Sequence, residues 1–412
     1  MRDKKRIAIV ACALALPGEK GYTRFDFLAN LLCEKGYDVD LYTSTFNHWE
    51  KKQRNSSDIK GIQNNTKYRI FLGYEPGYKK NVDIKRILSH LKLSKSILKI
   101  LDEEHRKKGY DLIYCDIPDN KLAEKLTKFA KAEGIPVIVD VEDLWPEGMK
   151  LVFNVPVLSD ILFYPFTKSA KNTYKNADAF VGTSDEFRDE PLKYFPDNDK
   201  PRKTVYVGCD LDTFDRGVYK NSDSIFKHKD EFWVIYTGTL GSSYDIPTLI
   251  RAAQKIKSID NNIKIKILGG GPLENDFKNI SKEFPCNVEF LGYQPYEKMA
   301  AYLVKSDVTI NSFVKAAPQS IVNKIGDYLA AGKPMINTCS SQEFRKKVIN
   351  DRFGINIWAE DVDSLTDAVM MLRQDKGRCK EMGENARKIA EQQFDRKVAY
   401  LEIINMISEA MH

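Results

Sequence analysis

A hydroxyl, a cation and a carboxylate recur at helical spacing in the stretch APQSIVNKIGDYLAAGKPMINT, residues 317–338. Ser320, Lys324 and Asp327 stand at positions i, i+4 and i+7, so they share one face of the helix that this stretch predicts. We expect that helix to begin at 318–320 and to end at Gly332. A helix start leaves backbone N–H groups unpaired, which suits an anion such as a pyrophosphate. The pattern predicts a nucleotide-sugar site, and a capped surface helix with an internal Lys–Asp pair is the alternative.

Glycine turns follow predicted strands in the second half of the chain. These turns are Gly238-Thr239-Leu240-Gly241 after 232–237, Gly269-Gly270-Gly271 after 263–268, and Gly292-Tyr293 after 288–291. Glycine at a strand end permits a tight turn and a close approach of backbone to a ligand. Together with the helix start, the turns predict a ring of ligand-binding backbone around one sheet edge. Neither the GxGxxG dinucleotide fingerprint nor the GxxxxGK[ST] phosphate loop occurs.

Short apolar strands alternate with helical stretches along the whole chain. We expect strands at 7–14, 38–43, 68–72, 111–115, 135–141, 179–183 and 203–207, and then at 232–237, 263–268, 288–291, 308–311 and 335–337. The polar segment 212–230 reads as a connection, and helices at 361–373 and 377–411 close the chain. This alternation predicts an α/β fold of two Rossmann-like, doubly wound parallel-sheet domains that face each other across a cleft.

The predicted domains follow from the length of 412 residues, which exceeds one ordinary core. We expect one domain over 1–207 and a second over 208–390. A last helix, about 391–412, is expected to pack back on the first domain.

Composition excludes several classes of protein. Hydrophobic residues make up 42% and charged residues 30%, as in soluble globular proteins, and no apolar run approaches the roughly 20 residues that span a bilayer. The start imitates a signal peptide, but the helical pattern after it favours a buried first strand. The 7 cysteines include no Cys-x-x-Cys pair, which favours a reducing cytoplasm. The 5 histidines show no ligand spacing, so we expect no metal and no cofactor.

Charge is unevenly distributed. Residues 1–100 hold 20 Lys and Arg against 10 Asp and Glu, an excess of +10 (20 − 10), within a net charge of +6. Such an excess indicates an anionic substrate or membrane surface, or a solvated lysine-rich surface as the alternative. We do not expect a nucleic-acid partner, because no recognition motif accompanies the basic residues.

Ordered phrases along the chain resemble a known family. YTGTL, ILGGGPLENDF, VEFLGYQPYEKMAAYLVKSDVTI and KIGDYLAAGKPMI, in that order, resemble the donor domain of glycosyltransferase family 4, which has the GT-B fold. GYTRFDFLANLLCEKGYDVDLYTST resembles the first loop, helix and strand of its acceptor domain, and VDVEDLWPEGM resembles a segment of members that build bacterial capsule or O-antigen polysaccharides. The resemblance covers nearly the whole chain. It implies a retaining transferase that moves a sugar from a nucleotide-sugar to a lipid-linked saccharide at the cytoplasmic membrane face.

The resemblance also implies roles for individual residues. Family members usually carry two glutamates eight positions apart at this helix start, and Gln319 and Asp327 hold those positions here. Gln319 is implied to contact the donor sugar without a charge, Asp327 to accept ribose O–H bonds, and Lys324 to neutralise the leaving pyrophosphate. The other implied donor-binding residues are Gly238, Thr239, Leu240, Gly241, Gly292, Tyr293, Ala317, Pro318 and Ser320.

One departure concerns the phosphate charges. The family often has an Arg and a Lys after the first glycine of the second domain, where this chain has Thr239 and Tyr244. The backbone N–H groups at 238–242 and 316–320 are then expected to assist Lys324.

The first domain supplies the implied acceptor side. Gly21, Tyr22 and Arg24 resemble the loop that faces the donor diphosphate. Asp143 and Glu147 follow the strand 135–141, so either could orient the acceptor hydroxyl, or simply cap a helix. The family needs no metal, and the leaving phosphate is implied to accept the acceptor's proton.

Basic and apolar stripes suggest a membrane surface. The apolar stripe is Leu158, Ile161, Leu162 and Phe166, and the basic residues are Lys79, Lys80, Lys85, Arg86, Lys92, Lys95, Lys168, Lys171 and Lys175. The stripes fit peripheral contact with anionic lipid, or a helix packed on the sheet. Two other functions stay open, namely a non-catalytic saccharide- or partner-binding module and a nucleotide-sugar epimerase of the same fold.

Overall fold

Two compact units make up the chain in a computed structural model that describes residues 4–80, 83–145, 158–283, 286–317 and 321–412. The first unit comprises Met1–Val205 together with Tyr400–His412, and the second comprises Tyr206–Ala399. The units therefore divide after Val205, two residues before the expected boundary, and the chain returns to the first unit at Tyr400, later than position 391. Within the described ranges, no helix has both the length and the apolar character needed to cross a bilayer.

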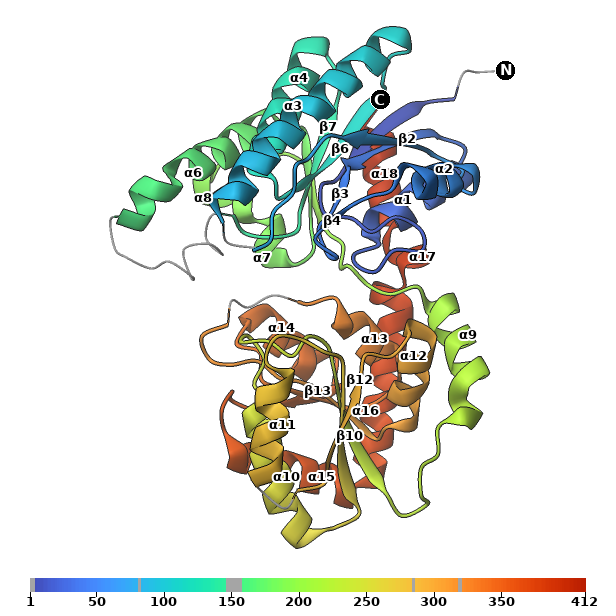
Figure 1. The fold of residues 1–412 in the computed structure, drawn as a ribbon, viewed down its shortest axis with the longest axis vertical. Coiled ribbons are helices and arrows are strands. Elements are labelled where there is room, and N and C mark those ends of the chain that lie inside the picture. The colour runs from blue at the N-terminus through green and yellow to red at the C-terminus, as the bar shows by residue number, and fades with distance from the viewer. Residues whose placement is uncertain (1–3, 81–82, 146–157, 284–285, 318–320) are drawn as a thin grey trace. The chain divides into compact units, whose positions relative to one another are not determined.

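A parallel seven-stranded sheet forms the centre of the first unit (Figure 1). Its strands are β1 (Arg6–Val10), β2 (Asp38–Ser44), β5 (Arg69–Gly73), β6 (Leu112–Ile117), β7 (Val137–Val141), β8 (Ala179–Gly182) and β9 (Arg202–Thr204). They lie in the order β5-β2-β1-β6-β7-β8-β9. The order reverses between β1 and β6, which is the point where ligands bind in open α/β sheets. A small antiparallel pair, β3 (Phe46–Asn47) and β4 (Lys52–Gln53), lies outside this sheet.

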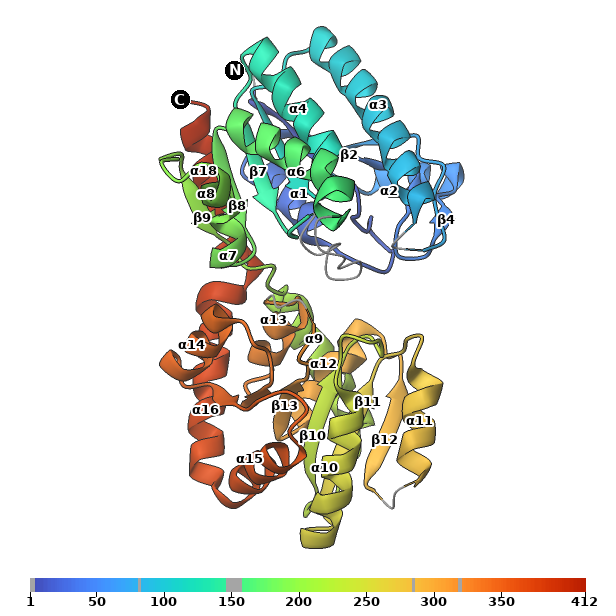
Figure 2. The ribbon, with the colours of Figure 1, turned by 90° about the vertical axis from the view of Figure 1, so that its left-hand side faces the viewer.

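Helices cover both faces of this sheet (Figures 1 and 2). They are α1 (Arg24–Glu34), α2 (Ser56–Asn64), α3 (Ile84–Lys107), α4 (Asn120–Glu133), α6 (Leu158–Asn176), α7 (Asp185–Arg188), α8 (Glu190–Tyr194) and α18 (Leu401–Ala410). Buried side chains of α3, α4 and α6 pack with β1, β6 and β7 in one core. Sequence signals set the ends of α4, because the Asp119 side chain accepts the Lys121 N–H and Gly134 ends the helix with a positive φ of 69°.

The second unit repeats the plan with six parallel strands. They are β10 (Phe232–Thr237), β11 (Ile263–Leu268), β12 (Val288–Gly292), β13 (Val308–Asn311), β14 (Met335–Asn337) and β15 (Gly354–Asn356), in the order β12-β11-β10-β13-β14-β15. Its helices are α9 (Leu211–Asn221), α10 (Ile246–Ile259), α11 (Glu274–Glu283), α12 (Tyr296–Lys305), α13 (Lys324–Ala330), α14 (Gln342–Asn350), α15 (Val362–Gln374), α16 (Lys376–Ile389) and α17 (Arg396–Ala399). The switch in strand order falls between β10 and β13. The α/β, doubly wound prediction is confirmed for both units.

Tertiary contacts overturn two of the expected elements. The segment 212–230 was expected to be a connection, but α9 occupies its first part, because Leu211, Phe214 and Gly217 turn one buried face toward the unit. The expected helix 377–411 is broken at Asp395, where a parallel bridge pairs the backbone with Cys209. Elements α2, α14 and β15 were not predicted at all.

Candidate functional site

The helix that carries Lys324 and Asp327 is shorter than the sequence predicts. Helix α13 begins at Lys324, and residues 321–322 before it are not helical, so the expected start at 318–320 is wrong for the described residues. Pro318, Gln319 and Ser320 lie outside the residues that the structure describes. Lys324 and Asp327 therefore occupy the first turn of a helix of 7 residues.

Aromatic rings surround the ammonium group of Lys324. Its Nζ lies 4.3 Å from the ring centroid of Tyr236, 4.6 Å from that of Tyr244 and 5.5 Å from that of Phe313. The atom is buried and has no hydrogen-bond partner among the described residues. Burial lowers the pKa of Lys324 to about 7. The rings favour the cation through their π faces but supply no anion, so the site is suited to receive one.

Asp327 accepts a hydrogen bond from a neighbouring helix of the same unit. The Tyr296 hydroxyl, at the start of α12, donates to Asp327 Oδ1 at 2.7 Å. Burial raises the pKa of Asp327 to about 6, although the Tyr296 hydrogen bond acts in the opposite direction. The carboxylate is thus ionised near neutral pH and has further lone pairs for a ligand's hydroxyl groups.

The predicted glycine turns lie against one another at the carboxyl ends of β10, β11 and β12. Gly238 has a φ of 142°, and a Cβ added there would lie 3.8 Å from Lys324 Nζ. A Cβ on Gly269 would lie 1.9 Å from the Gly238 carbonyl oxygen, so that position tolerates no side chain. The Gly269 N–H donates to the Gly292 carbonyl at 2.9 Å. The structure therefore brings Lys324 and all three turns together.

The turn backbone is less available than the sequence suggests. The amides of Gly238 and Leu240 donate to the carbonyls of Leu268 and Gly270, so the expectation that the whole run 238–242 offers free N–H groups is wrong. The side chain of Leu240 is buried in the core and presents nothing to a ligand. The amides of Thr239 and Gly241 have no partner in the described part of the chain.

The remaining donor candidates differ in their exposure. Thr239 and Tyr293 are exposed, whereas Ala317 is buried and its amide donates to the Val314 carbonyl at 3.1 Å. Tyr244, the second departure from the resemblance, is one of the rings around Lys324.

In the first unit, Arg24 is not positioned to face a diphosphate. Its guanidinium is fully buried, and Nε donates to Asp140 Oδ2 at 2.8 Å. It also donates to the Val205 carbonyl at 3.1 Å and lies over the Tyr400 ring. The expectation of a ligand-facing Arg24 is therefore wrong, because the salt bridge to a central strand holds the side chain inside the unit.

Gly21 and Tyr22 are also engaged within the unit. Gly21 has a φ of 135°, and a Cβ there would overlap the Trp49 ring at 2.2 Å. The Tyr22 hydroxyl donates to Glu142 Oε1 at 2.6 Å. These contacts fix the loop in place. Tyr22 is hydrogen-bonded to a carboxylate that is not among the predicted site residues.

That carboxylate, Glu142, directly follows β7. Its side chain is 12% exposed, and burial together with the nearby Asp140 raises the pKa of Glu142 to about 8. Asp143 is exposed, and its oxygens accept from the Leu144 amide at 2.8 Å and from Trp145 Nε1 at 3.1 Å, both within residues 143–145, which are not helical. Glu147 lies outside the described residues. The strand-end rule could have found Glu142 if it had been applied to the first residue after the strand.

A second group, which the sequence does not indicate, lies at the carboxyl ends of β5 and β6. The His90 ring stacks on Trp145 with 6.3 Å between centroids, and His90 Nδ1 lies 3.4 Å from Asp119 Oδ2. On its other side, His90 Nε2 lies 3.7 Å from Glu75 Oε1. The scattered sequence positions gave no signal for this cluster, because β5, α3 and β6 bring its members together only in the fold. Across the described residues, no group of three or more His, Cys, Asp or Glu side chains is arranged to hold a metal ion.

Comparisons with known proteins bear on this geometry. Residues 219–389 match the family model described as glycosyl transferases group 1. A search of curated proteins finds no match. Among solved structures, sucrose-phosphate synthase from Thermosynechococcus elongatus is similar, with a TM-score of 0.70, 17% identity, and coverage of 98% of this chain and 99% of that one.

Two further structures are similar over nearly their whole length. HepE from Anabaena, solved in complex with UDP, gives a TM-score of 0.70 at 14% identity and covers 98% of this chain and 100% of its own. WaaG, a glycosyltransferase involved in lipopolysaccharide biosynthesis, gives a TM-score of 0.65 at 13% identity. The match covers 97% of this chain and 99% of WaaG. Residues 219–389 thus match the glycosyl transferases of group 1, and the chain as a whole has the fold of GT-B glycosyltransferases with two Rossmann-like domains.

Proposed function

We propose that this protein is a retaining glycosyltransferase that moves a sugar from a nucleotide-sugar to a lipid-linked saccharide in the synthesis of a cell-surface polysaccharide. The observation that carries the proposal is Lys324, a buried ammonium without a partner in the described residues. It lies beside the Gly238 turn, at the switch point of the unit that matches group 1 glycosyl transferases. A nucleotide diphosphate would supply the anion that this ammonium lacks.

The neighbouring groups support the same donor. Asp327 would accept the ribose hydroxyls, and the amides of Thr239 and Gly241 would donate to a phosphate. Gln319 would contact the donor sugar, as the sequence resemblance implies. HepE, of the same fold, is solved with UDP and with UDP-glucose, which makes uridine donors the first to test.

The acceptor hydroxyl would meet the carboxylates after β7. We place Glu142 first among them, because its raised pKa and partial exposure suit an exchange of protons near neutral pH. Asp143 and Glu147 remain alternatives. No metal is part of the proposal, so EDTA should leave the transfer rate unchanged, and a loss of rate that Mg²⁺ restores would contradict that part.

Titration calorimetry with UDP-, GDP- and dTDP-sugars tests the donor half of the proposal. We expect one nucleotide class to bind, and Lys324→Met to weaken its binding at least about tenfold, the loss expected when a charge-assisted contact is removed. Lys346→Met is the matched control, because Lys346 is exposed on α14 and should leave the affinity unchanged. If no donor binds and none is hydrolysed, the proposal fails.

The lipid half of the proposal rests on apolar side chains at the starts of α3 and α6. Ile84 and Ile161 are 74% and 68% exposed, and Leu88, Leu162 and Tyr164 are more than half exposed. The predicted alternative, a helix whose apolar stripe packs on the sheet, does not describe Ile161 and Leu162. Exposed apolar side chains beside Lys85 and Lys168 suit the surface of an anionic bilayer.

Sedimentation with phosphatidylglycerol vesicles tests this surface. We expect binding that weakens with salt and that Ile84→Ser with Ile161→Ser reduces severalfold. Ile259→Ser with Ile349→Ser, at exposed isoleucines of the second unit, is the control. Equal binding of the two double variants would remove the lipid contact from the proposal.

Two alternative functions predict different outcomes with a nucleotide-sugar. A binding module would be stabilised by a nucleotide-sugar but would not convert it to products. This alternative is considered because Thr239 and Tyr244 stand where the family often has basic residues. An epimerase would release an altered sugar and free nucleotide without any acceptor. Product analysis with and without lipid-linked saccharide therefore separates the three functions, which the fold alone does not.

A further inference from the structure

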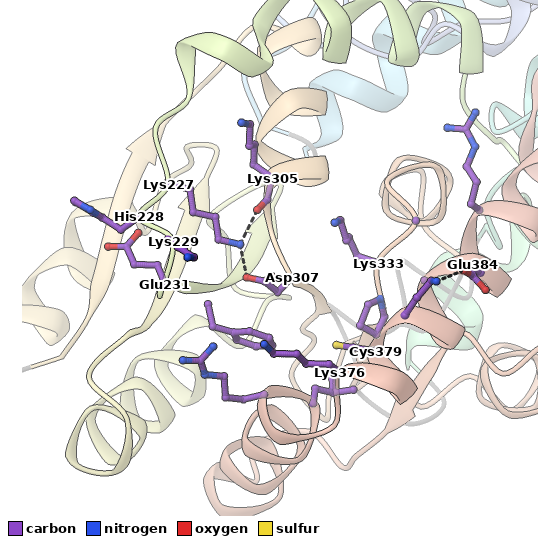
Figure 3. Close-up of a pocket in the computed structure, with 18 residues that line it drawn as sticks. Lys227, His228, Lys229, Glu231, Lys305, Asp307, Lys333, Lys376, Cys379 and Glu384 are labelled. Carbon is purple, nitrogen blue, oxygen red and sulfur yellow. Dashed lines mark hydrogen bonds and ion pairs between the residues drawn. The ribbon is translucent and has the colours of Figure 1, made fainter.

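A charged hollow lies within the second unit, and we infer that it binds a phosphate-bearing polyanion (Figure 3). The hollow has a volume of about 800 Å³, which is room for a ligand of nucleotide size. Its basic lining residues are Lys227, Lys229, Lys305, Lys333, Arg373, Lys376, Lys380 and Arg387, against the acidic residues Glu231, Asp307 and Glu384. The lining thus carries 8 cations against 3 anions, a formal excess of +5 (8 − 3).

The hollow lies at the opposite end of the sheet from the glycine turns. Phe232 begins β10, Asp307 immediately precedes β13, and Pro334 immediately precedes β14, and all three line the hollow. Gly238 and the other turns follow the carboxyl ends of the strands. Because all strands of this sheet are parallel, a ligand in the hollow is separated from the donor residues by the length of the strands. It would therefore be a second ligand and not the donor.

Some of the cations are already neutralised. Lys227 Nζ lies 2.5 Å from Asp307 Oδ2 and donates to the Lys305 carbonyl at 3.0 Å. Arg373 is paired with Asp260 at 2.9 Å and Arg387 with Asp215 at 2.7 Å, so neither needs a ligand. These pairs fix the walls of the hollow.

Four lysines remain without an ion-pair partner among the described residues. They are Lys229, Lys305, Lys333 and Lys376. They come from separate segments, namely the loop before β10, the end of α12, the turn before β14 and the start of α16, and all four line the hollow, although the Lys305 side chain points away from Lys333 and Lys376 in Figure 3. Like charges gathered this way repel one another, so a folded protein gains stability when an anion joins them.

Lys333 indicates that the cluster is more than a solvated surface. Its side chain is only partly exposed, and burial lowers its pKa, with Lys227 acting in the same direction and Asp307 in the opposite one. A lysine held away from water is destabilised as a charge, and a phosphate group beside it reverses that effect. Several separated cations favour a ligand with more than one phosphate charge. Such a group could come from a soluble diphosphate or from lipid headgroups.

Calorimetry with inorganic pyrophosphate on the full chain tests the inference. We expect saturable binding in the wild type and in Lys324→Met, because the hollow does not include Lys324. In the triple variant Lys305→Gln, Lys333→Gln and Lys376→Gln, we expect the affinity to fall at least about tenfold. The double variant Lys346→Gln with Lys388→Gln, at exposed lysines outside the hollow, should keep the wild-type affinity.

The other outcomes separate the sources of phosphate and the competing site. Binding to phosphatidylglycerol vesicles that the triple variant loses, without pyrophosphate binding, would assign the hollow to lipid headgroups. Pyrophosphate binding that is lost in Lys324→Met but kept in the triple variant would belong to the donor site and overturn the inference. Failure of both probes would also overturn it. Lys376→Gln alone changes an exposed residue, so a weakened affinity there shows that misfolding of the triple variant is not the cause.

Discussion

Lys324 Nζ lies 4.3 Å from the ring centroid of Tyr236 and 4.6 Å from that of Tyr244, and no acceptor among the described residues reaches it. A buried ammonium without an anion lowers the stability of the fold that holds it. Its place beside the Gly238 turn gives a reason for that cost, because a ligand phosphate can complete the site.

Replacement of Lys324 should therefore separate stability from binding. We expect Lys324→Met to raise the free energy of unfolding by roughly 1–3 kcal/mol at or below pH 7, since a well-packed apolar side chain replaces a buried charge. The difference in unfolding free energy between Lys324→Met and the wild type should shrink between pH 7 and 10.5. In that range the unfolded wild-type chain keeps the Lys324 proton that the folded chain has released, so the wild type becomes more stable as the pH rises. Urea unfolding at several pH values measures it. A loss of stability at pH 7 would contradict the account of Lys324 as a strained cation.

The donor affinity should have a narrow pH optimum. Asp327 must be ionised to accept ribose hydroxyls, so the affinity should rise as the pH passes about 6. Lys324 loses its proton above about 7 in the free protein, so the affinity should fall on the alkaline side. Binding titrations from acid to alkaline pH measure both limbs, and an affinity that is flat across neutral pH would exclude these two groups from the site.

Tyr296 should set the acid limb of that profile. Its hydroxyl donates to Asp327 at 2.7 Å, and this bond favours the ionised carboxylate. In Tyr296→Phe the pKa of Asp327 should rise further, which moves the acid limb to higher pH without changing the alkaline limb. Tyr219→Phe, at a tyrosine that is 89% exposed on α9, serves as the control. A uniform loss of affinity at every pH would instead indicate a direct contact between Tyr296 and the donor.

The Arg24–Asp140 pair should be structural. In Asp140→Ala the Arg24 guanidinium stays buried without its main carboxylate, so we expect about 3–5 kcal/mol of destabilisation in urea. Lys67→Ala, which removes an exposed pair with Glu34, should cost less than about 1 kcal/mol. A small effect of Asp140→Ala would show that Glu142, 3.2 Å from Arg24 Nε, takes over the charge.

We expect that position 208 does not tolerate a side chain. Its φ is +62°, and an added Cβ would lie 2.2 Å from the Phe394 carbonyl oxygen. Gly208→Ala should therefore lower the free energy of unfolding by more than about 1 kcal/mol, through both the backbone conformation and the contact. Gly61→Ala is the matched control, because Gly61 lies within α2 with open space around it, and alanine there should stabilise by about 0.5–1 kcal/mol. Thermal unfolding of both variants checks the difference in sign.

Much of the fold was predictable from local pattern. The bounds expected for β10, β11, β13 and β14 are the observed ones, because each strand is a short segment between clear turn signals. The grouping of Gly238, Gly269 and Gly292 followed from one rule, that parallel strands end at a common edge.

Other features depended on contacts that no local pattern contains. The break at Asp395 comes from pairing with Cys209, and α9 is helical because its apolar face packs in the unit. The helix was predicted to start at 318–320, earlier than the observed start at Lys324. A proline and polar residues indicate that a helix begins nearby, but they do not determine its first residue.

The sequence by itself determined the α/β class, the two successive sheets and the identity of the chemical groups near Lys324. Only the tertiary structure decided which of those groups are available to a ligand. The sequence predicts Arg24 to be a ligand-binding cation, but in the fold it is buried against Asp140. Glu142 and the lysines of the charged hollow, by contrast, gain their environment from distant segments. The physical reason is that charge and periodicity are local properties of a chain, but burial and pairing, which set pKa and reactivity, are properties of packing.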